Sequence, residues 1–200
     1  MLNNLLRGIE KIPGVNLQQV LVLGDDRFIL TPKVGSRAIR NALLDMHDLC
    51  VGGEWQYIEY HTKRSLVSLL EKQRVYIVLR DPLPRLHSCW KQKVYKFRDR
   101  SLVSYFWIYF PLIRRDMSFL SFLKAVKIIP PSLSEKHFRP VAVTVDLSHH
   151  NLVKIRLNDL NAVLRKQSRA NMTPDVEVPK ECIEYFNENL AKRYECDAVG

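Results

Sequence analysis

Two turns of the chain carry residue types that suit the binding of an anion. The first turn reads Thr-Pro-Lys-Val-Gly-Ser-Arg-Ala over residues 31–38 and follows a short apolar run. A helix that starts near Ser36 leaves backbone N–H groups unpaired and directed at this turn, and Gly35 allows a ligand to approach the backbone closely. Lys33 adds a mobile positive charge. These features favour a phosphate or sulfate site, although an ordinary strand-to-helix turn with a solvated lysine has the same pattern.

The second turn follows an apolar run at residues 75–79 and begins with Arg-Asp-Pro. Arg80 comes directly after this run, where its guanidinium can offer a forked pair of N–H donors to a phosphate. Ser88 follows about two helical turns later and could reach the same anion if the chain folds back. Arg85 could share that face or stay in solvent. Arg80 could instead pair with Asp81 or cap a helix.

These turns must be positioned by the elements around them, and the sequence predicts an alternation of strands and helices. Short apolar or strand-like runs lie at 20–23, 28–30, 55–60, 75–79 and 153–157. Helical patterns lie at 39–46, 65–72, 86–94, 118–126, 158–166 and 179–194. Repeated strand–turn–helix units favour an α/β fold with a central parallel sheet flanked by helices, and residues 1–200 suit a single domain. Ligands bind beyond the carboxyl ends of such strands, so the turns after Leu30 and Leu79 are expected to form the site.

In this order the two turns resemble the cofactor motifs of sulfotransferases that use 3′-phosphoadenosine 5′-phosphosulfate (PAPS). Residues 32–36 resemble the 5′-phosphosulfate loop of carbohydrate sulfotransferases of the chondroitin, dermatan and HNK-1 group, and residues 33–38 are similar to the Lys-Gly-Gly-Thr-Arg-Ala loop of heparan sulfotransferases. Residues 78–88 resemble the 3′-phosphate motif, an Arg-Asp-Pro segment with a Ser eight residues after its Arg. His-Phe-Arg-Pro at 137–140 resembles the His-Trp-Arg-Pro segment of the carbohydrate group. The likeness extends from residue 28 onward, with 155–160 similar to the late strand-to-helix element and 184–194 to the closing helix.

The resemblance implies a P-loop-like sulfotransferase fold and in-line transfer of a sulfuryl group from PAPS to an acceptor hydroxyl or amine. A carbohydrate, or another hydroxyl-bearing small molecule, is the expected acceptor. Lys33 would stabilise the charge that develops on the leaving phosphate, and Arg80 and Ser88 would hold the 3′-phosphate. The residues implied in cofactor binding are Lys33, Val34, Gly35, Ser36, Arg37, Arg80 and Ser88.

A general base must take the proton of the acceptor, and two candidates follow the first helical pattern. Glu59 and His61 are two residues apart, so in a strand they face the same side. His61 is favoured because its ordinary pKa of about 6.5 suits neutral pH, although either could be a surface residue. His47 and His87 are weaker candidates, and the pair at 149–150 suits a loop.

Two further stretches allow more than one interpretation. The aromatic run at 105–110 could be core, could line an acceptor cleft, or could touch a membrane or partner. The basic stretch at 165–169 could be a loop over the cofactor or a solvated helix end.

The composition adds a net charge of +10, from 31 Lys and Arg against 21 Asp and Glu, so anionic partners are favoured. Two alternatives follow, a basic nucleic-acid-binding module and a nucleotide kinase-like protein. Neither a recognisable nucleic-acid motif nor the GxxxxGK[ST] loop occurs, so no specific nucleic acid is expected. The four cysteines form no CxxC pair, which predicts no metal site and a cytoplasmic setting. We expect no signal peptide and no transmembrane segment; the oligomeric state is left open.

Overall fold

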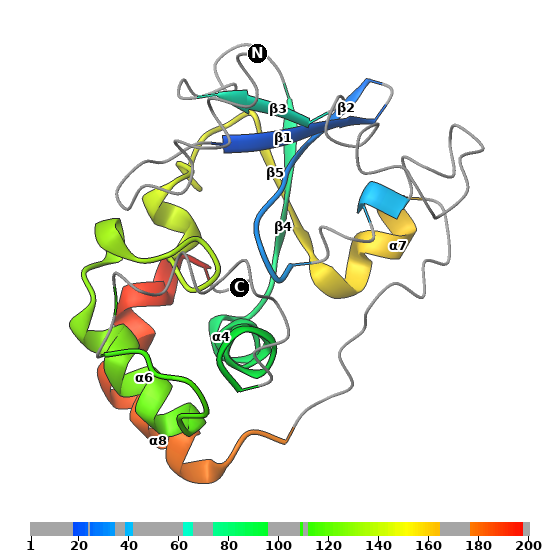
Figure 1. Cartoon of the computed structure of the whole chain (residues 1–200). Coiled ribbons are helices and arrows are strands. Elements are labelled where there is room, and N and C mark those ends of the chain that lie inside the picture. Colours follow the sequence, from blue (N-terminus) through cyan, green and yellow to red (C-terminus); the bar gives the residue numbers. More distant parts are fainter. Residues whose placement is uncertain are drawn as a thin grey trace.

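A mixed five-stranded sheet occupies the middle of the described molecule (Figure 1). The computed structural model describes residues 18–23, 25–34, 39–41, 62–65, 74–95, 109, 112–164 and 177–197. The strands are β1 (Gln18–Leu23), β2 (Asp26–Ile29), β3 (Thr62–Ser65), β4 (Val75–Leu79) and β5 (Leu152–Arg156), in the spatial order β3-β1-β2-β4-β5. The α/β class expected from the sequence is confirmed.

The expectation of a parallel sheet holds for only part of it. β4 runs parallel to both β2 and β5, whereas β1 runs antiparallel to both β2 and β3. The reason is the short connection between β1 and β2, because only two residues separate Leu23 from Asp26. Two residues can close a hairpin, but a parallel crossover needs a dozen or more. The first two apolar runs are therefore one hairpin rather than two strand–helix units.

Alternating side chains on the strands bury the two faces of the sheet in separate clusters. One cluster contains Leu21, Phe28, Leu30, Val34, Ile39, Val78, Ile155 and Leu160, the last from α7 (Leu160–Val163). The other contains Val20, Ile29, Val75, Ile77, Leu79, Val141, Val145, Leu147 and Leu152, and includes part of the short helix η5 (Val141–Val143). Both faces are thus covered, as the nearly continuous apolar run of β4 requires.

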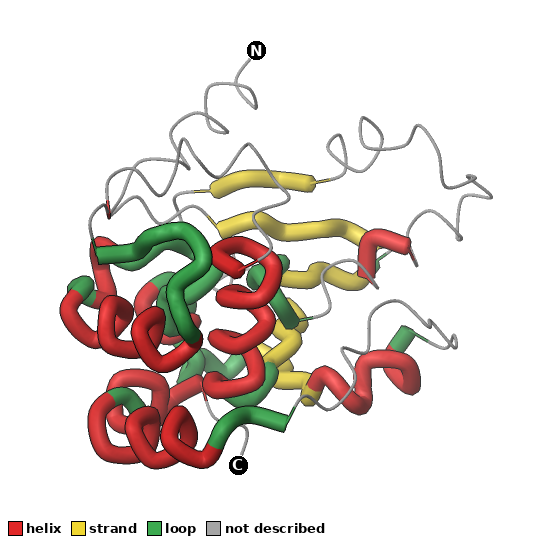
Figure 2. Tube along the Cα trace, turned by 60° about the horizontal axis from the view of Figure 1, so that its bottom comes forward, coloured by secondary structure: helices red, strands yellow, loops and turns green. Residues whose placement is uncertain are grey.

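Most of the helical structure gathers at one side of the sheet (Figure 2). α4 (Pro82–Trp90) leaves the carboxyl end of β4 and continues into the π-helical turn η1 (Lys91–Tyr95). α6 (Phe119–Ile128), α8 (Lys180–Asn189) and η7 (Ala191–Asp197) pack with α4 around a third core. This core includes Leu86, Phe122 and Phe138, none of which is exposed to solvent. The remaining short helices are η4 (Pro131–Leu133) and η6 (Leu157–Asp159).

The strongest periodic patterns of the sequence correspond to these elements. Ser118 begins α6 as its N-cap, and its hydroxyl accepts the backbone N–H of Ser121 at 3.1 Å. Helical structure is confirmed within 118–126 and 179–194, but in the described part of 158–166 it is confined to η6 and the four residues of α7. Ser65, expected to begin a helix, instead ends β3; residues 66–72 and the expected strand at 55–60 lie outside the described ranges. Nowhere in those ranges is a helix both long and apolar enough to cross a membrane.

Candidate functional site

The two turns singled out by the sequence leave the same edge of the sheet. β2 and β4 are parallel neighbours, with Phe28 opposite Tyr76 and Ile29 opposite Ile77. Just beyond this register the Thr31 hydroxyl donates a hydrogen bond to the carbonyl of Val78 at 3.3 Å. The chain segments that follow β2 and β4 therefore start side by side, at the carboxyl end of the parallel strands.

Lys33 occupies an unusual backbone conformation within the first turn. Its φ is 68°, in the left-handed region that non-glycine residues rarely adopt. Pro32 before it and the left-handed residue after the proline are typical of a type II turn. Val34 is 1% exposed and belongs to a sheet cluster, which anchors the turn. The Lys33 ammonium donates a hydrogen bond to the side-chain oxygen of Gln92 in η1.

Arg80 and Ser88 occupy the second turn and the helix after it. Arg80 is half-buried directly after β4, and Ser88 is 5% exposed on α4. Between them His87 is buried, with its ring edge-on to Phe119 at 4.9 Å. Burial lowers the pKa of His87, and the charges of Lys91 and Arg80 add to the lowering. The His87 ring is therefore neutral and packs against Phe119. The charge of Arg80 helps to keep it neutral.

Arg85 is a structural residue. It is 1% exposed, its guanidinium pairs with Asp197 at 3.0 Å and it donates to the carbonyl of Arg139 at 2.8 Å. The alternative that Arg85 stays in solvent is therefore wrong. Asp197 also accepts the backbone N–H groups of Val141 at 2.8 Å and Ala142 at 3.1 Å. One buried carboxylate thus joins α4, η5 and the end of the described chain.

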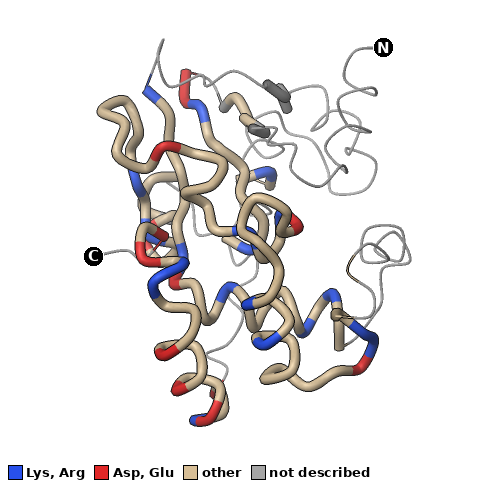
Figure 3. The backbone as a smooth tube through the Cα atoms, turned by 90° about the vertical axis from the view of Figure 1, so that its left-hand side faces the viewer, with Lys and Arg blue, Asp and Glu red and all other residues tan. Residues whose placement is uncertain are grey.

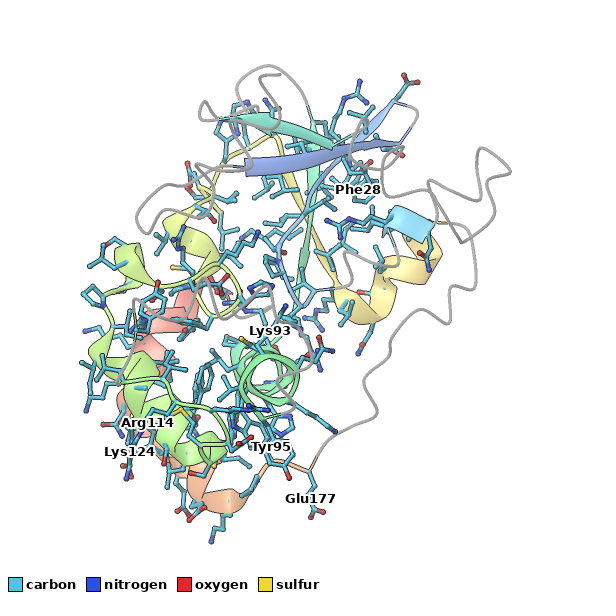
Figure 4. All side chains as sticks on the ribbon, viewed as in Figure 1. Phe28, Lys93, Tyr95, Arg114, Lys124 and Glu177 are labelled. Carbon is cyan, nitrogen blue, oxygen red and sulfur yellow. The ribbon has the colours of Figure 1, made fainter. Side chains whose placement is uncertain are left out.

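Cys89 on α4 is fully buried. Burial raises the pKa of its thiol to about 12; Glu135 adds to the rise, whereas Lys33, Arg85 and Lys93 oppose it. The thiol is therefore protonated at neutral pH. The hydrogen bond to Gln92 ties Lys33 to η1, and Lys93 is the next residue of η1. Figure 4 shows Lys93 on the side of α4 that faces the sheet.

Glu135 and His137 form a hydrogen-bonded pair shortly after η4. His137 Nδ1 lies 2.7 and 2.9 Å from the two oxygens of Glu135, and the backbone N–H of His137 donates to the same carboxylate at 2.7 Å. Burial opposes ionisation of Glu135, but these interactions with His137 hold the pKa of Glu135 below its usual range. Burial lowers the pKa of His137 against the opposing effect of Glu135, and Lys93 and Lys136 add to the lowering. At neutral pH the ring is therefore neutral and carries its proton on Nδ1.

The sequence alone does not point to this pair. His137 was noted only within the resemblance at 137–140, and Glu135, Gln92 and Lys93 were not singled out. The available signal was the spacing, because a carboxylate two residues before a histidine can bond to both its ring and its backbone N–H when the chain turns.

Several other predictions concern residues that are only partly described. Within the aromatic run at 105–110, Tyr109 is core: it is 7% exposed, its hydroxyl donates to the carbonyl of Leu133 at 2.5 Å, and its ring lies 5.7 Å from that of Phe138. The other residues of the run, the basic stretch at 165–169, and the site residues Gly35, Ser36, Arg37, Glu59 and His61 lie outside the described ranges. The rings of His149 and His150 stack at 4.5 Å, and the described ranges contain no group of three potential metal ligands.

No family model matches the chain, and neither the curated proteins nor the solved structures include a significant match. The geometry of the two turns and of the charged residues beside α4 therefore carries the functional argument.

Proposed function

We propose that this protein is a sulfotransferase that binds PAPS across the carboxyl ends of β2 and β4. The single observation that supports the proposal is the parallel pairing of these strands, which brings the turn of Lys33 and the turn of Arg80 to one edge. A donor with a phosphosulfate at its 5′ end and a phosphate at its 3′ position needs two cationic contacts on one surface. Lys33 and Arg80 are suited to be those contacts.

In this proposal Lys33 acts on the leaving group. The sulfuryl group moves in line from the bridging oxygen of the donor to the acceptor, and negative charge grows on the bridging oxygen as its bond to sulfur breaks. The ammonium of Lys33 and backbone N–H groups at 35–37 would stabilise that charge. Arg80 would bind the 3′-phosphate through its forked donors, with Ser88 as its partner. The acceptor would be a carbohydrate hydroxyl, or a hydroxyl or amine of a small molecule.

A cytoplasmic setting belongs to the same proposal. The cysteines within the described ranges, Cys89, Cys182 and Cys196, are free thiols, as is usual in a reducing compartment.

The experiment that tests the cofactor class is a thermal-shift comparison of adenosine nucleotides. We expect 3′-phosphoadenosine 5′-phosphate (PAP) to raise the melting temperature by about 5 °C or more at one hundred times its Kd, because a ligand bound only to the folded state stabilises it by about 2.7 kcal/mol. AMP and ADP, which lack the 3′-phosphate, should give smaller shifts. Lys33→Ala should abolish the PAP shift.

The matched control is Lys124→Ala. Lys124 is exposed on α6, which belongs to neither of the two turns (Figure 4), so the PAP shift should be unchanged. An absence of any PAP shift in the wild-type protein would refute the proposal.

The same panel also tests the two alternatives. Lys and Arg occur throughout the described chain (Figure 3), and the net charge of +10 would favour non-specific nucleic-acid binding. Salt-sensitive binding to random-sequence DNA, with no response to PAP, would support the nucleic-acid module. A response to ATP with Mg²⁺ but not to PAP would support the kinase-like alternative.

A further inference from the structure

We propose that Gln92 positions Lys33 for the 5′ end of the donor, by holding the Lys33 ammonium through its side-chain oxygen. The inference rests on the proposed binding of PAPS and deepens it, because that proposal assigns no role to Gln92. It makes η1 a third part of the site, beside the turns of Lys33 and Arg80.

The contact orients the ammonium without cancelling its charge. Lys33 donates a hydrogen bond to the side-chain oxygen of Gln92, across 59 residues of chain. This acceptor is a neutral amide oxygen, whereas a carboxylate at the same place would form an ion pair and compete with an anionic ligand. A neutral acceptor therefore suits a lysine whose charge must remain available to a phosphosulfate.

The backbone of Lys33 is fixed on both sides, so its side chain decides where the charge lies. Two residues earlier, the Thr31 hydroxyl donates to the carbonyl of Val78 at 3.3 Å. One residue later, Val34 is 1% exposed and packs on the sheet. The four-carbon stem of a lysine is flexible, and the hydrogen bond to Gln92 restricts it at its far end.

Gln92 lies in η1, a π-helical turn of a kind that is rare and frequent at functional sites. This turn is anchored on both sides of Gln92. The indole N–H of Trp90 donates to the carbonyl of Met117 at 2.8 Å, and Val94 is 3% exposed within the helical core. The exposed side chain of Gln92 therefore extends to Lys33 from a fixed backbone.

The same helical segment carries Ser88, which would bind the other end of the donor. α4 continues into η1 without a break, because the backbone N–H of Lys91 still donates to the carbonyl of Ser88. Gln92 follows Ser88 by four residues, or about one helical turn. One continuous helix thus connects the proposed 3′-phosphate residue with the partner of Lys33. It would fix the separation of the two phosphate contacts.

This arrangement predicts that Gln92 affects only one end of a bound nucleotide. Lys33 would contact the 5′-phosphate, whereas Arg80 and Ser88 would contact the 3′-phosphate. PAP carries both phosphates, and adenosine 3′-monophosphate carries only the second. A positioning role for Gln92 therefore changes the affinity for PAP alone, whereas a merely structural role in η1 changes both affinities.

Isothermal titration calorimetry with these two nucleotides tests the prediction and needs no acceptor. Gln92→Met keeps the length and helix propensity of the side chain but replaces the amide with a weak acceptor. PAP affinity should fall about fivefold, as expected when one long side chain must be ordered on binding. The affinity for adenosine 3′-monophosphate should stay within about twofold of wild type.

Gln92→Glu tests whether a neutral acceptor is needed. It keeps an oxygen for Lys33 but adds a negative charge beside the proposed 5′-phosphate. PAP affinity should fall further than in Gln92→Met, and the additional loss should diminish as the salt concentration rises, because salt screens the repulsion. The matched control is Tyr95→Phe, in the same turn, where the ring packs 5.0 Å from that of Trp90. This variant should bind both nucleotides as the wild type does.

A measurement on the free protein tests the contact in the absence of any nucleotide. The ¹³C relaxation of lysine Cε atoms should show Lys33 more ordered than Lys154, which is exposed on β5. In Gln92→Met, Lys33 should become as mobile as Lys154. Equal mobility of the two lysines in the wild-type protein would overturn the inference.

The outcomes separate this inference from the function on which it rests. If PAP does not bind the wild-type protein, the cofactor class fails and the role of Gln92 fails with it. If PAP binds the wild type and Gln92→Met equally well, or if Gln92→Met weakens both nucleotides to the same extent, Gln92 does not position Lys33 although the cofactor class stands. A loss confined to PAP supports the inference.

Discussion

Lys33 and Gln92 share a hydrogen bond across 59 residues of chain, and this contact joins the turn after β2 to the end of the helix that follows β4. The ammonium of lysine has three donors and one of them meets Gln92. Gln92 restricts an otherwise mobile side chain, which reduces the entropy lost when an anion binds.

The left-handed conformation of Lys33 predicts a difference between two substitutions. A non-glycine residue at φ 68° carries about 1 kcal/mol of strain, which Lys33→Ala retains and Lys33→Gly removes. Both variants should lose the PAP melting shift. In urea denaturation the glycine variant should nevertheless be at least as stable as the alanine variant, despite the greater flexibility of its unfolded chain. A normal PAP shift in either variant would rule out the role of Lys33.

Arg80 should control recognition of the 3′-phosphate rather than of the whole nucleotide. Arg80→Lys keeps the charge but loses the forked donors, so PAP affinity should fall about tenfold, as expected when a bidentate contact worth over 1 kcal/mol is removed. The affinity for AMP should change little. Isothermal titration calorimetry with both nucleotides measures the two effects, and an equal loss for both would contradict a specific 3′-phosphate contact.

The buried ion pair between Arg85 and Asp197 should contribute strongly to stability. Asp197→Ala leaves an uncompensated buried guanidinium and should lower the free energy of unfolding by about 3–5 kcal/mol. The control is the exposed pair of Lys180 and Glu184, at 3.6 Å on α8. Glu184→Gln should cost less than about 0.5 kcal/mol in the same denaturation experiment. If Asp197→Ala lowered the free energy of unfolding by less than about 1 kcal/mol, water would have access to the ion pair.

Stability should depend on pH through buried histidines. Burial lowers the folded-state pKa of His87 and His137, so below about pH 6.5 the unfolded chain binds more protons than the folded protein. The free energy of unfolding should therefore decrease as pH falls below about 6.5. The low pKa of Glu135 adds a further loss when pH falls below about 4.3, the ordinary value of a glutamate.

Substitution of one histidine tests the origin of this slope. His137→Asn should show a shallower fall in stability between pH 6.5 and about 5 than the wild-type protein, measured by denaturation at each pH. Equal slopes for His137→Asn and the wild type would show that His137 titrates alike in both states.

Local patterns in the sequence were sufficient to locate β4 and its helix. The five apolar residues at 75–79 form a strand buried on both faces. Pro82 is at the start of α4, where a backbone N–H would have no partner within the helix, so a proline is tolerated. The sequence also predicts that the two turns lie at one edge of the sheet, because neighbouring parallel strands such as β2 and β4 end at the same side. The position of each of these elements required only residues close together in the sequence.

The rest depends on partners far along the chain. The Thr-Lys-Arg-Ser segment at 62–65 has no apolar alternation, yet it forms β3 because β1 offers an unpaired edge. Arg85 has the same local setting as a solvated helix residue, and only the fold supplies Asp197 as its partner. The hydrogen bond from Arg85 to the carbonyl of Arg139 likewise depends on packing between α4 and a segment 54 residues later.

The long separation of Arg85 and Asp197, 112 residues, has a consequence for biosynthesis. At a translation rate of about 5–20 residues per second, α4 leaves the ribosome roughly 6–22 seconds before its counter-ion is made. During that interval the guanidinium of Arg85, which is buried in the folded protein, has no Asp197 carboxylate to pair with. The buried ion pair that joins α4 to η7 can therefore form only after residue 197 has left the ribosome.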